Sequence, residues 1–444
     1  MTKKNPNILL VVIDSLRSDR ITSQEYAKIP NIRKLIKEGT MFSQVISTSD
    51  VTGTCLGSLF SGVYPFETGI TQTNIETSKM GFFKNLKKNN YKLFATIPKY
   101  TWFEKIIKDF DDYFMFDHTK WKEEETILGQ LGNKALEFFK KNTKTEPWFH
   151  YLHLVDIHGT GSLVKVPEQF NSEEWGKSKY DQLLSATDSW LKLIFEQISL
   201  EDTLVIITSD HGEYVESDFD LRDMPNFYKA MRKLKKKFPQ LTFLGEKFFL
   251  FVLNTNEKIK TRNIDIEKEK KFIPRGYTKY LFDDVIKIPL IITGLNTPNQ
   301  MEIKNLVRQI DIYPTIARLA NIEIDEKIHG RDIFSSIENN ENEIPAYIEV
   351  GSIKPKTPGK TIGIRTSSYK YFRNRIEKNK DVFLFDLEKD PKEQNNISLD
   401  QPKIISKYEE ILEKILKNSK DFSGEKISDE EKMIEEELRK MGYL

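Results

Sequence analysis

Continuous apolar runs that end on polar residues recur along the chain, and they predict its central strands. The run Ile8–Ile13 ends on Asp14, and the run Leu204–Ile207 leads through two hydroxyl residues to Asp210. A run without alternation is typical of a strand buried on both faces, as in a parallel sheet. Further runs of this kind are Tyr91–Ile97, Phe149–Val155 and Pro289–Thr293.

Helical patterns lie between these runs, at Pro30–Gly39, Gly132–Lys141 and Tyr180–Ile198. Strands that alternate with helices predict an α/β fold, a doubly wound and mainly parallel sheet flanked by helices. Open sheets of this type bind ligands at the carboxyl ends of their strands. The polar residues that follow the strands are therefore the first candidates for a functional site.

Two segments depart from this pattern. Residues 214–275 are long, charged and without a clear strand, and we expect an insertion over the catalytic face. Its basic run Arg232–Lys237 could contact an anionic substrate, although such a run is more often a solvated helix face. Beyond residue 335 come short strand-like pieces, which are Ala346–Val350, Gly363–Arg365, Tyr369–Arg373 and Val382–Phe385. A charged helical tail follows from about Pro402. We expect a catalytic domain over 1–335 and a smaller C-terminal α+β subdomain with an antiparallel sheet over 336–444.

Composition narrows the class of protein. The 444 residues are 38% hydrophobic and 30% charged, which suits a soluble globular protein, and the net charge of +1 favours neither a nucleic acid nor a membrane surface as a partner. The single cysteine, Cys55, excludes an internal disulfide and fits a reducing compartment. We see no signal peptide and no run near the roughly 20 apolar residues of a transmembrane segment. We expect a cytoplasmic protein, and homo-oligomerisation stays open.

Asp14, Asp210 and His211 follow predicted central strands and should meet at one edge of the sheet. Two carboxylates and an imidazole can hold a divalent metal ion: oxygen ligands suit Ca²⁺, Mg²⁺ or Mn²⁺, and the imidazole also admits Zn²⁺. The alternative is that each aspartate caps the helix that follows it.

The segment Val51–Gly62 is rich in small and hydroxyl residues, and its second half, Ser58–Gly62, can start a helix. Thr52 could supply a nucleophile, because coordination to a metal ion lowers the high pKa of an alcohol. Proximity does not separate Thr52 from its hydroxyl neighbours, which are Ser47, Thr48, Ser49, Thr54 and Ser58.

Asp156 and His158 end another predicted strand. The His158 imidazole could protonate a leaving group or bind an ester oxygen, and His153 is a weaker candidate. Lys99 and Lys279 could pair with anionic ester oxygens.

In these residues the chain resembles the sulfatase family, within the alkaline phosphatase superfamily. The similar stretches are Asn5–Asp19, Pro30–Phe42, Ser58–Pro65, Ser209–Glu213, Asp283–Ile291, Val307–Thr315, His329–Asp332, Phe383–Pro391 and Leu438–Leu444. They occur in the family's order and cover nearly the whole chain apart from the insertion. The resemblance implies an alkaline phosphatase-like fold, with Asp14, Asp210 and His211 in the positions of metal ligands.

The departures from the family pattern lie at the nucleophile. Sulfatases typically carry a Cys/Ser-x-Pro-x-Arg motif whose first residue is oxidised to formylglycine. Counting back from Ser58, that position falls on Thr52, which cannot be oxidised in this way, and Cys55 lies three residues too late. Thr54 and Leu56 stand at the proline and arginine positions, and Ser15 replaces the second of the paired acids common in sulfatases.

A threonine at this position resembles the branch of the superfamily that acts on phosphoesters, phosphonates and phospho-group transfers through a phospho-threonine. A later His-Gly motif, expected shortly before Asp283, is missing, and Arg275-Gly276 is the nearest match, so we expect one metal ion and a substrate-binding role for His158. Lys279 is out of register with the family's substrate lysine.

We therefore predict a hydrolase of phosphate or sulfate esters, small-molecule or glycan, without formylglycine. The predicted metal ligands are Asp14, Thr52, Asp210 and His211, the predicted catalytic residues Thr52 and His158, and the predicted substrate contacts Lys99, Asp156 and Lys279. Three alternatives remain: a true sulfatase, a phosphoglycerol- or phosphoethanolamine-type phosphotransferase acting on surface glycans, and a non-catalytic binding protein.

Overall fold

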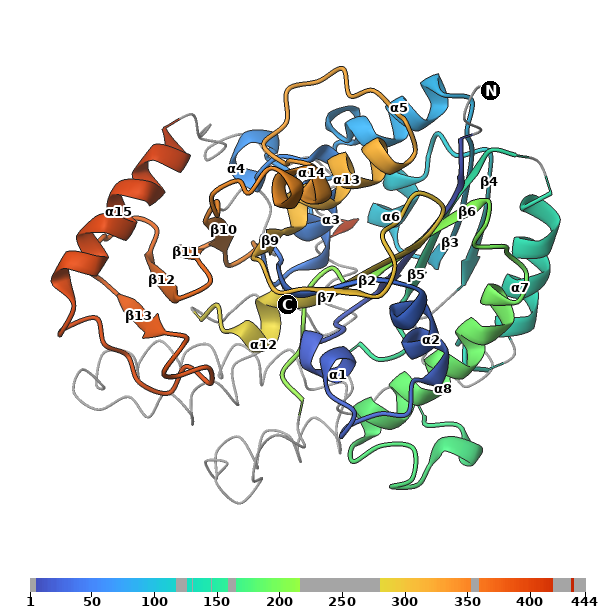
Figure 1. Cartoon of the computed structure of the whole chain (residues 1–444), viewed down its shortest axis with the longest axis horizontal. Coiled ribbons are helices and arrows are strands. Elements are labelled where there is room, and N and C mark those ends of the chain that lie inside the picture. Colours follow the sequence, from blue (N-terminus) through green and yellow to red (C-terminus); the bar gives the residue numbers. More distant parts are fainter. Residues whose placement is uncertain are drawn as a thin grey trace.

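A computed structural model describes residues 5–116, 126–129, 131–144, 146–158, 165–215, 280–352, 359–417 and 433–434 of the chain. Its strands form two sheets, a larger one through the centre of the molecule and a smaller one beside it (Figure 1). Most of the predicted insertion, and Lys279, Arg232–Lys237, Arg275-Gly276 and Leu438–Leu444, lie outside the described residues. No helix among the described residues has the length and apolar character that crossing a membrane requires.

The larger sheet has the strand order β4-β3-β5-β1-β6-β7-β2-β8, and β9 also pairs with β2. The strands are β1 Asn7–Ile13, β2 Gly39–Ile46, β3 Lys92–Pro98, β4 Asp112–Phe116, β5 Trp148–Leu154, β6 Thr203–Thr208, β7 Lys287–Gly294, β8 Met301–Ile303 and β9 Val307–Arg308. Only β7 runs antiparallel to its neighbours among these described strands. The sheet is therefore mainly parallel, as predicted.

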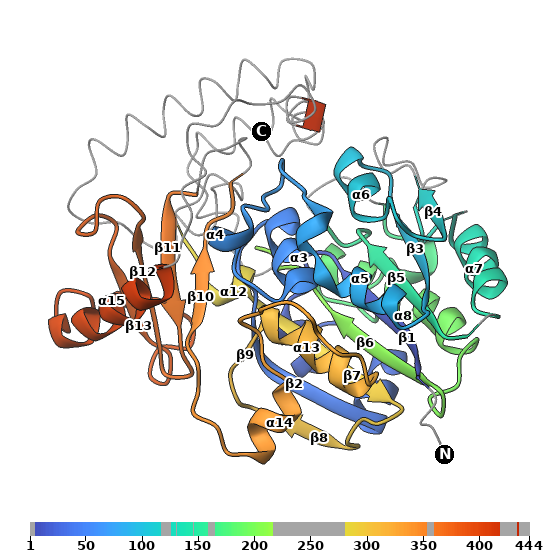
Figure 2. The ribbon, with the colours of Figure 1, turned by 90° about the horizontal axis from the view of Figure 1, so that it is seen from above.

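Helices cover both faces of this sheet, which explains the continuous apolar runs. In β1, alternate residues serve two cores: Leu10 lies in one with α3, and Val11 in the other with α8. One face carries α3 Thr52–Ser61, α5 Gly81–Lys88, α6 Thr101–Ile106, α13 Ile312–Leu319 and α14 Ile333–Glu338. The other carries α1 Ser18–Thr22, α2 Pro30–Glu38, α7 Leu131–Asn142 and α8 Lys179–Phe195. Figure 2 looks onto the face with α3, α5 and α13. Shorter elements are α4 Pro65–Thr68, α12 Asp283–Ile286, η1 Thr77–Lys79, η3 Glu168–Phe170 and η7 Gln309–Asp311.

The smaller sheet is antiparallel throughout, in the order β10-β11-β12-β13. Its elements are β10 Ala346–Glu349, β11 Thr361–Arg365, β12 Tyr369–Asn374, β13 Phe383–Asp386 and the helix α15 Pro402–Leu416, which packs against β11. This confirms the predicted C-terminal subdomain, and the domain boundary at residue 335 stays a prediction.

The smaller sheet supports the segment that leads into α3. The Glu349 N–H donates to the Thr48 carbonyl at 2.9 Å, and the Gly351 N–H donates to Asp50 Oδ1 at 2.8 Å. The smaller sheet therefore fixes the path of the chain just before Thr52.

Candidate metal and nucleophile site

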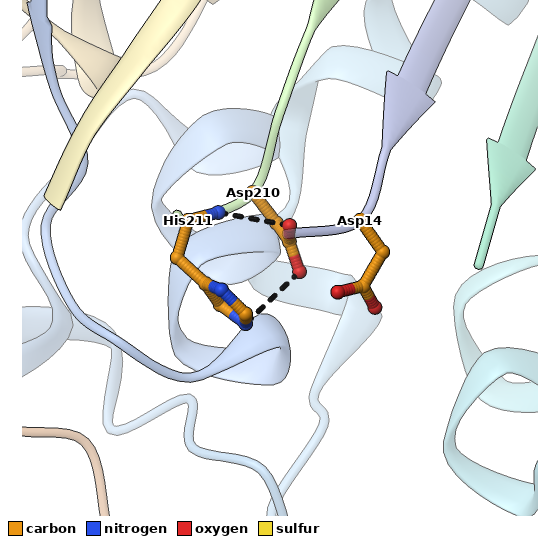
Figure 3. A group of neighbouring side chains, drawn as sticks. All are labelled: Asp14, Asp210 and His211. Carbon is orange, nitrogen blue, oxygen red and sulfur yellow. Dashed lines mark hydrogen bonds and ion pairs between the residues drawn. The ribbon is translucent and has the colours of Figure 1, made fainter. Parts of the chain in front are cut away.

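Asp14, Asp210 and His211 meet at the carboxyl ends of the adjacent parallel strands β1 and β6 (Figure 3). One ligand atom from each lies within 4.8 Å of the others, and all three residues are buried. Neither aspartate caps a helix, because α1 begins at Ser18 with Arg17 as its N-cap and residues 211–215 are not helical. The helix-capping alternative is therefore wrong, and the predicted convergence is present.

The His211 ring is oriented by its own backbone. Its Nδ1 lies 2.9 Å from the Gly212 carbonyl oxygen, which can only accept a hydrogen bond, so Nδ1 carries the proton. In the neutral ring Nε2 then presents a lone pair to the site, 3.4 Å from Asp210 Oδ2. Histidine ligands of metal ions commonly have this arrangement.

The two oxygens of Asp210 have different environments. Oδ1 accepts hydrogen bonds from the backbone N–H groups of Ser15 at 3.1 Å and His211 at 2.8 Å. Oδ2 is buried and has no hydrogen-bond partner among the described residues. A buried carboxylate oxygen in that state costs free energy that a cation would recover. The donor set therefore fits a divalent metal ion.

Thr52 lies directly beside this group. Its Oγ1 is 3.2 Å from His211 Nε2, and it is the first residue of α3. Because the positive end of the helix dipole and unsatisfied N–H groups lie at a helix N-terminus, this position favours negative charge on or near Oγ1.

The start of α3 differs from the sequence prediction, which placed a helix from Ser58. The helix begins six residues earlier, although Gly53 and Gly57 have low helix propensity. All ten residues of α3 are buried, so tertiary packing outweighs propensity. At Gly53 a Cβ would lie 2.7 Å from the Gln72 Cα, so only glycine admits this close approach.

Cys55 lies inside α3, three residues after the Thr52 position that a formylglycine would occupy. Its thiol donates to the Ser49 carbonyl at 3.1 Å. Burial and the nearby Asp210 raise the pKa of the thiol well above its usual value. Cys55 is therefore a neutral, structural thiol.

Two further histidines lie beside Asp14. His158 Nε2 lies 3.9 Å from Asp14 Oδ1, and His153 Nε2 lies 3.5 Å from Asp14 Oδ2. Burial alone would raise the pKa of Asp14, but the charge of the His158 imidazole and the polar contact with His153 outweigh it and hold the pKa well below its usual value. Asp14 is therefore a carboxylate, as a metal ligand must be.

The three predicted substrate contacts are Lys99, Asp156 and Lys279, and the two described ones are not part of the group around Asp14. Asp156 is buried, and its Oδ1 accepts a hydrogen bond from the Leu128 N–H at 3.3 Å. Among the described residues it makes no hydrogen bond or ion pair with the metal-ligand group, which is formed by Asp14, Asp210 and His211. Burial raises the pKa of Asp156 to about 6. Lys99 is exposed just after β3, and Lys279 lies outside the described residues. Their contacts with substrate stay predictions.

Sequence reasoning missed Gln309 in η7. Its Nε2 donates to the Asp210 carbonyl at 2.7 Å, and its Oε1 accepts from the Thr48 N–H at 3.2 Å. Gln309 thereby joins the β6 ligand strand to the segment before Thr52. It falls within the family-like stretch Val307–Thr315, but a neutral amide there gives no signal of this role.

Comparison with known proteins agrees with this architecture. The sulfatase family model matches residues 6–322, and the model of the C-terminal region of N-sulphoglucosamine sulphohydrolase matches residues 276–421. An uncharacterized protein of Haemophilus influenzae is 32% identical over 213 residues, which span 47% of this chain and 32% of that protein. Bovine arylsulfatase K is 21% identical over 463 residues, with 93% and 82% of the two chains covered.

Among solved structures, the phosphonate monoester hydrolase of Agrobacterium radiobacter is similar in fold, with a TM-score of 0.66 and 14% identity over 92% of this chain and 95% of that one. The sulfatase family model covers well over half of the chain. The protein therefore belongs to the sulfatase family and is a hydrolase acting on ester bonds.

Proposed function

We propose that the protein is a metal-dependent hydrolase of phosphate or phosphonate esters that works through a covalent Thr52 intermediate. The observation that carries this proposal is the 3.2 Å approach of Thr52 Oγ1 to His211 Nε2, at the N-terminus of α3 and beside Asp210. An alcohol held at the positive end of a helix, next to two metal-type carboxylates, is suited to attack an electrophilic phosphorus.

Asp14, Thr52, Asp210 and His211 would hold the divalent ion. When bound, such an ion supplies the positive charge that lowers the pKa of the Thr52 hydroxyl and stabilises the group being transferred. An imidazole ligand favours Mn²⁺ or Zn²⁺ over Ca²⁺, which prefers six to eight oxygen ligands.

The protein's own residues would carry the reaction in two steps. The Thr52 hydroxyl first releases its proton to solvent. Oγ1 then attacks phosphorus, so that its bond to phosphorus forms while the bond to the leaving oxygen breaks. His158, beside Asp14, gives a proton to that leaving oxygen. Water then attacks the phosphorus of the phospho-threonine and gives a proton to His158. The bond from phosphorus to Oγ1 breaks, phosphate (or phosphonate) leaves, and Thr52 Oγ1 regains a proton from solvent.

The threonine also separates phosphate from sulfate chemistry. The aldehyde hydrate of formylglycine can expel its sulfate by elimination, whereas Thr52 has no second hydroxyl on that carbon. A phospho-threonine can instead be displaced at phosphorus. An acceptor alcohol could replace water in the second step, so transfer to a glycan uses the same intermediate.

A matched pair of isosteric variants tests the proposal. Thr52→Val removes the nucleophile, while Thr54→Val removes a buried hydroxyl that has no hydrogen-bond partner among the described residues. The substrates are an aryl phosphate, a phosphodiester, a phosphonate monoester and an aryl sulfate, each with and without an added acceptor alcohol.

We expect turnover of the phosphorus esters to fall by at least about 10³-fold in Thr52→Val and to persist in Thr54→Val. Turnover of the aryl sulfate alone would support the true-sulfatase alternative, and a strict need for the acceptor alcohol would support the transferase. Full activity of Thr52→Val on every ester would overturn the proposal.

A further inference from the structure

The geometry points to Tyr151 and His153 as a positioning pair that orients the Asp14 carboxylate for metal binding. Tyr151 OH lies 2.6 Å from His153 Nδ1, and His153 Nε2 lies 3.5 Å from Asp14 Oδ2. The three side chains thus form a line from the core of the sheet to the metal-ligand group. This inference rests on the metal site of the proposed function.

The two strands place these residues in register. His153 in β5 pairs with Val12 in β1, two residues before Asp14, and the Asp14 N–H donates to the Leu154 carbonyl at 2.8 Å. Tyr151 and His153 are separated by two positions in β5, so their side chains share one face of the sheet. The β1–β5 pairing therefore fixes His153 beside the Asp14 carboxylate.

Packing holds both rings in place. Tyr151 meets the edge of Phe60 in α3, with ring centroids 5.4 Å apart, and His153 meets Phe103 in α6 at 4.6 Å. Both Tyr151 and His153 are fully buried. Because neither ring has room to turn, the direction of His153 Nε2 toward Asp14 is set by the core.

The direction of the hydrogen bonds follows from the chemistry of the groups. Burial raises the pKa of Tyr151 well above its usual value, so the phenol keeps its proton. A phenol that donates to Nδ1 leaves the proton of a neutral imidazole on Nε2, facing a carboxylate oxygen that accepts. The opposite tautomer would leave the phenol hydrogen without an acceptor and would set a lone pair against Oδ2.

His153 Nε2 is buried and makes no hydrogen bond among the described residues, so its contact with Asp14 Oδ2 is an approach of two polar atoms that a bound ion could complete. At 3.5 Å this contact is long for a hydrogen bond, and the proposal is that it closes when Asp14 holds an ion. Outer-sphere hydrogen bonds of this kind orient metal ligands, and their loss typically weakens metal affinity about 10- to 100-fold.

His150 offers a matched control on the same strand. It is also fully buried, and one of its ring nitrogens also has a hydroxyl partner, here Nε2 with Thr96 Oγ1 at 3.0 Å. Its ring packs on Phe139 at 4.8 Å, on the opposite face of the sheet. Losing the His150 imidazole therefore removes a similar buried group at a place that does not face Asp14.

The test measures the affinity of the purified full chain for Mn²⁺ and Zn²⁺ by competition with a chromophoric chelator, without any substrate. The variants are His153→Phe, His153→Gln, Tyr151→Phe and His150→Phe, with Asp210→Asn as the variant that lacks a direct ligand. We expect affinity to fall about 10- to 100-fold in His153→Phe, and less in Tyr151→Phe. It should recover partly in His153→Gln, whose amide can donate from a similar place, and stay unchanged in His150→Phe.

Wild-type affinity in His153→Phe would overturn the inference, as would an equal loss in His150→Phe. If His153→Phe does not fold, Tyr151→Phe tests the inference instead. An unchanged metal affinity in Tyr151→Phe would then overturn the positioning role of the Tyr151–His153 pair. Failure of the wild-type protein to bind either ion, or binding unaffected by Asp210→Asn, would instead overturn the metal site of the proposed function.

Discussion

Two buried groups of charged residues in this protein differ in how the negative charge of their carboxylates is compensated. The junction cluster, formed by Asp283, Glu393, Lys370 and Arg365, joins the larger sheet to the smaller one. There Lys370 Nζ lies 2.5 Å from Asp283 Oδ1 and 2.7 Å from Glu393 Oε1, and Arg365 lies 3.1 Å from Asp283 Oδ2. The two carboxylates of this cluster are therefore balanced by two positively charged side chains.

The metal-ligand group, formed by Asp14, Asp210 and His211, has no such balance. Among the described residues, the ion-pair partners of its two carboxylates are all histidines. Burying charge without a compensating charge is costly. The difference teaches that the acids of the junction cluster have permanent cations as partners, whereas the carboxylates of the metal-ligand group lack the positive charge that the proposed metal ion would supply.

Asp156 shows a third way to bury an acid, by holding its proton up to a higher pH than usual. Its pKa is raised to about 6 because it is buried, and its ion-pair partners do not include a lysine or arginine in the described part of the chain. These three solutions make separable predictions for stability, metal binding and activity.

The largest effect should come from Asp210→Asn. Loss of a direct ligand should remove metal-dependent turnover by at least about 10³-fold, because the ion contributes several kcal/mol to catalysis. The thermal midpoint of the metal-stripped variant should equal or exceed that of the stripped wild type, since one uncompensated charge is gone. A variant that unfolds more easily without metal would place Asp210 with the structural acids.

Lys370→Met should have the opposite effect, a loss of stability without a loss of metal affinity. Removing the cation leaves Asp283 and Glu393 buried with less compensation, which typically costs about 3 to 5 kcal/mol of stability. Chemical denaturation measures this loss. The metal affinity of the folded variant should match that of the wild type, and a large fall in affinity would contradict the separation of the two clusters.

Asp156→Asn tests the protonated acid. Between about pH 4 and pH 6 the folded state holds a proton that the unfolded state releases, so wild-type stability should fall as pH rises through this window. The asparagine keeps the acceptor for Leu128 and has no charge to bury. We expect it to be more stable than the wild type at pH 8, by up to about 3 kcal/mol, and no more stable at pH 4. An equal advantage at both pH values would contradict the raised pKa.

The smallest effect concerns metal binding alone. An ion at 100 times its dissociation constant should stabilise the wild type and Lys370→Met by about 2.7 kcal/mol each. Asp210→Asn should gain little. Thermal unfolding with added Mn²⁺, Zn²⁺ or Ca²⁺ measures this, and when the three ions are compared at one fixed concentration the gain should be smallest with Ca²⁺.

Part of this site was predictable because its residues follow strands. Asp14, Asp210 and His211 come directly after apolar runs, and parallel strands bring their carboxyl ends together. The mainly parallel fold followed from the same runs. The strand β2 was not predicted because Ser43 and Gln44 interrupt its apolar pattern, at an irregularity in its pairing with β7.

Other features depend on contacts between distant segments and leave no local signal. The early start of α3 at Thr52 depends on packing against residues 70–72. Gln309 reaches Asp210 across 99 positions of the chain. The line from Tyr151 through His153 to Asp14 requires the β1–β5 pairing, which joins segments about 140 residues apart in the sequence. Thr52 itself was singled out only by its spacing within a family-like motif.

The most direct test of the central claim is to trap the intermediate. Metal-loaded protein is mixed with an aryl phosphate or phosphonate ester and quenched in acid within a turnover, and its peptides are mapped by mass spectrometry. The account predicts one phosphoryl or phosphonyl group on Thr52, absent from Thr52→Val and from metal-stripped protein. Modification of a different residue, or continued turnover by Thr52→Val, would contradict it.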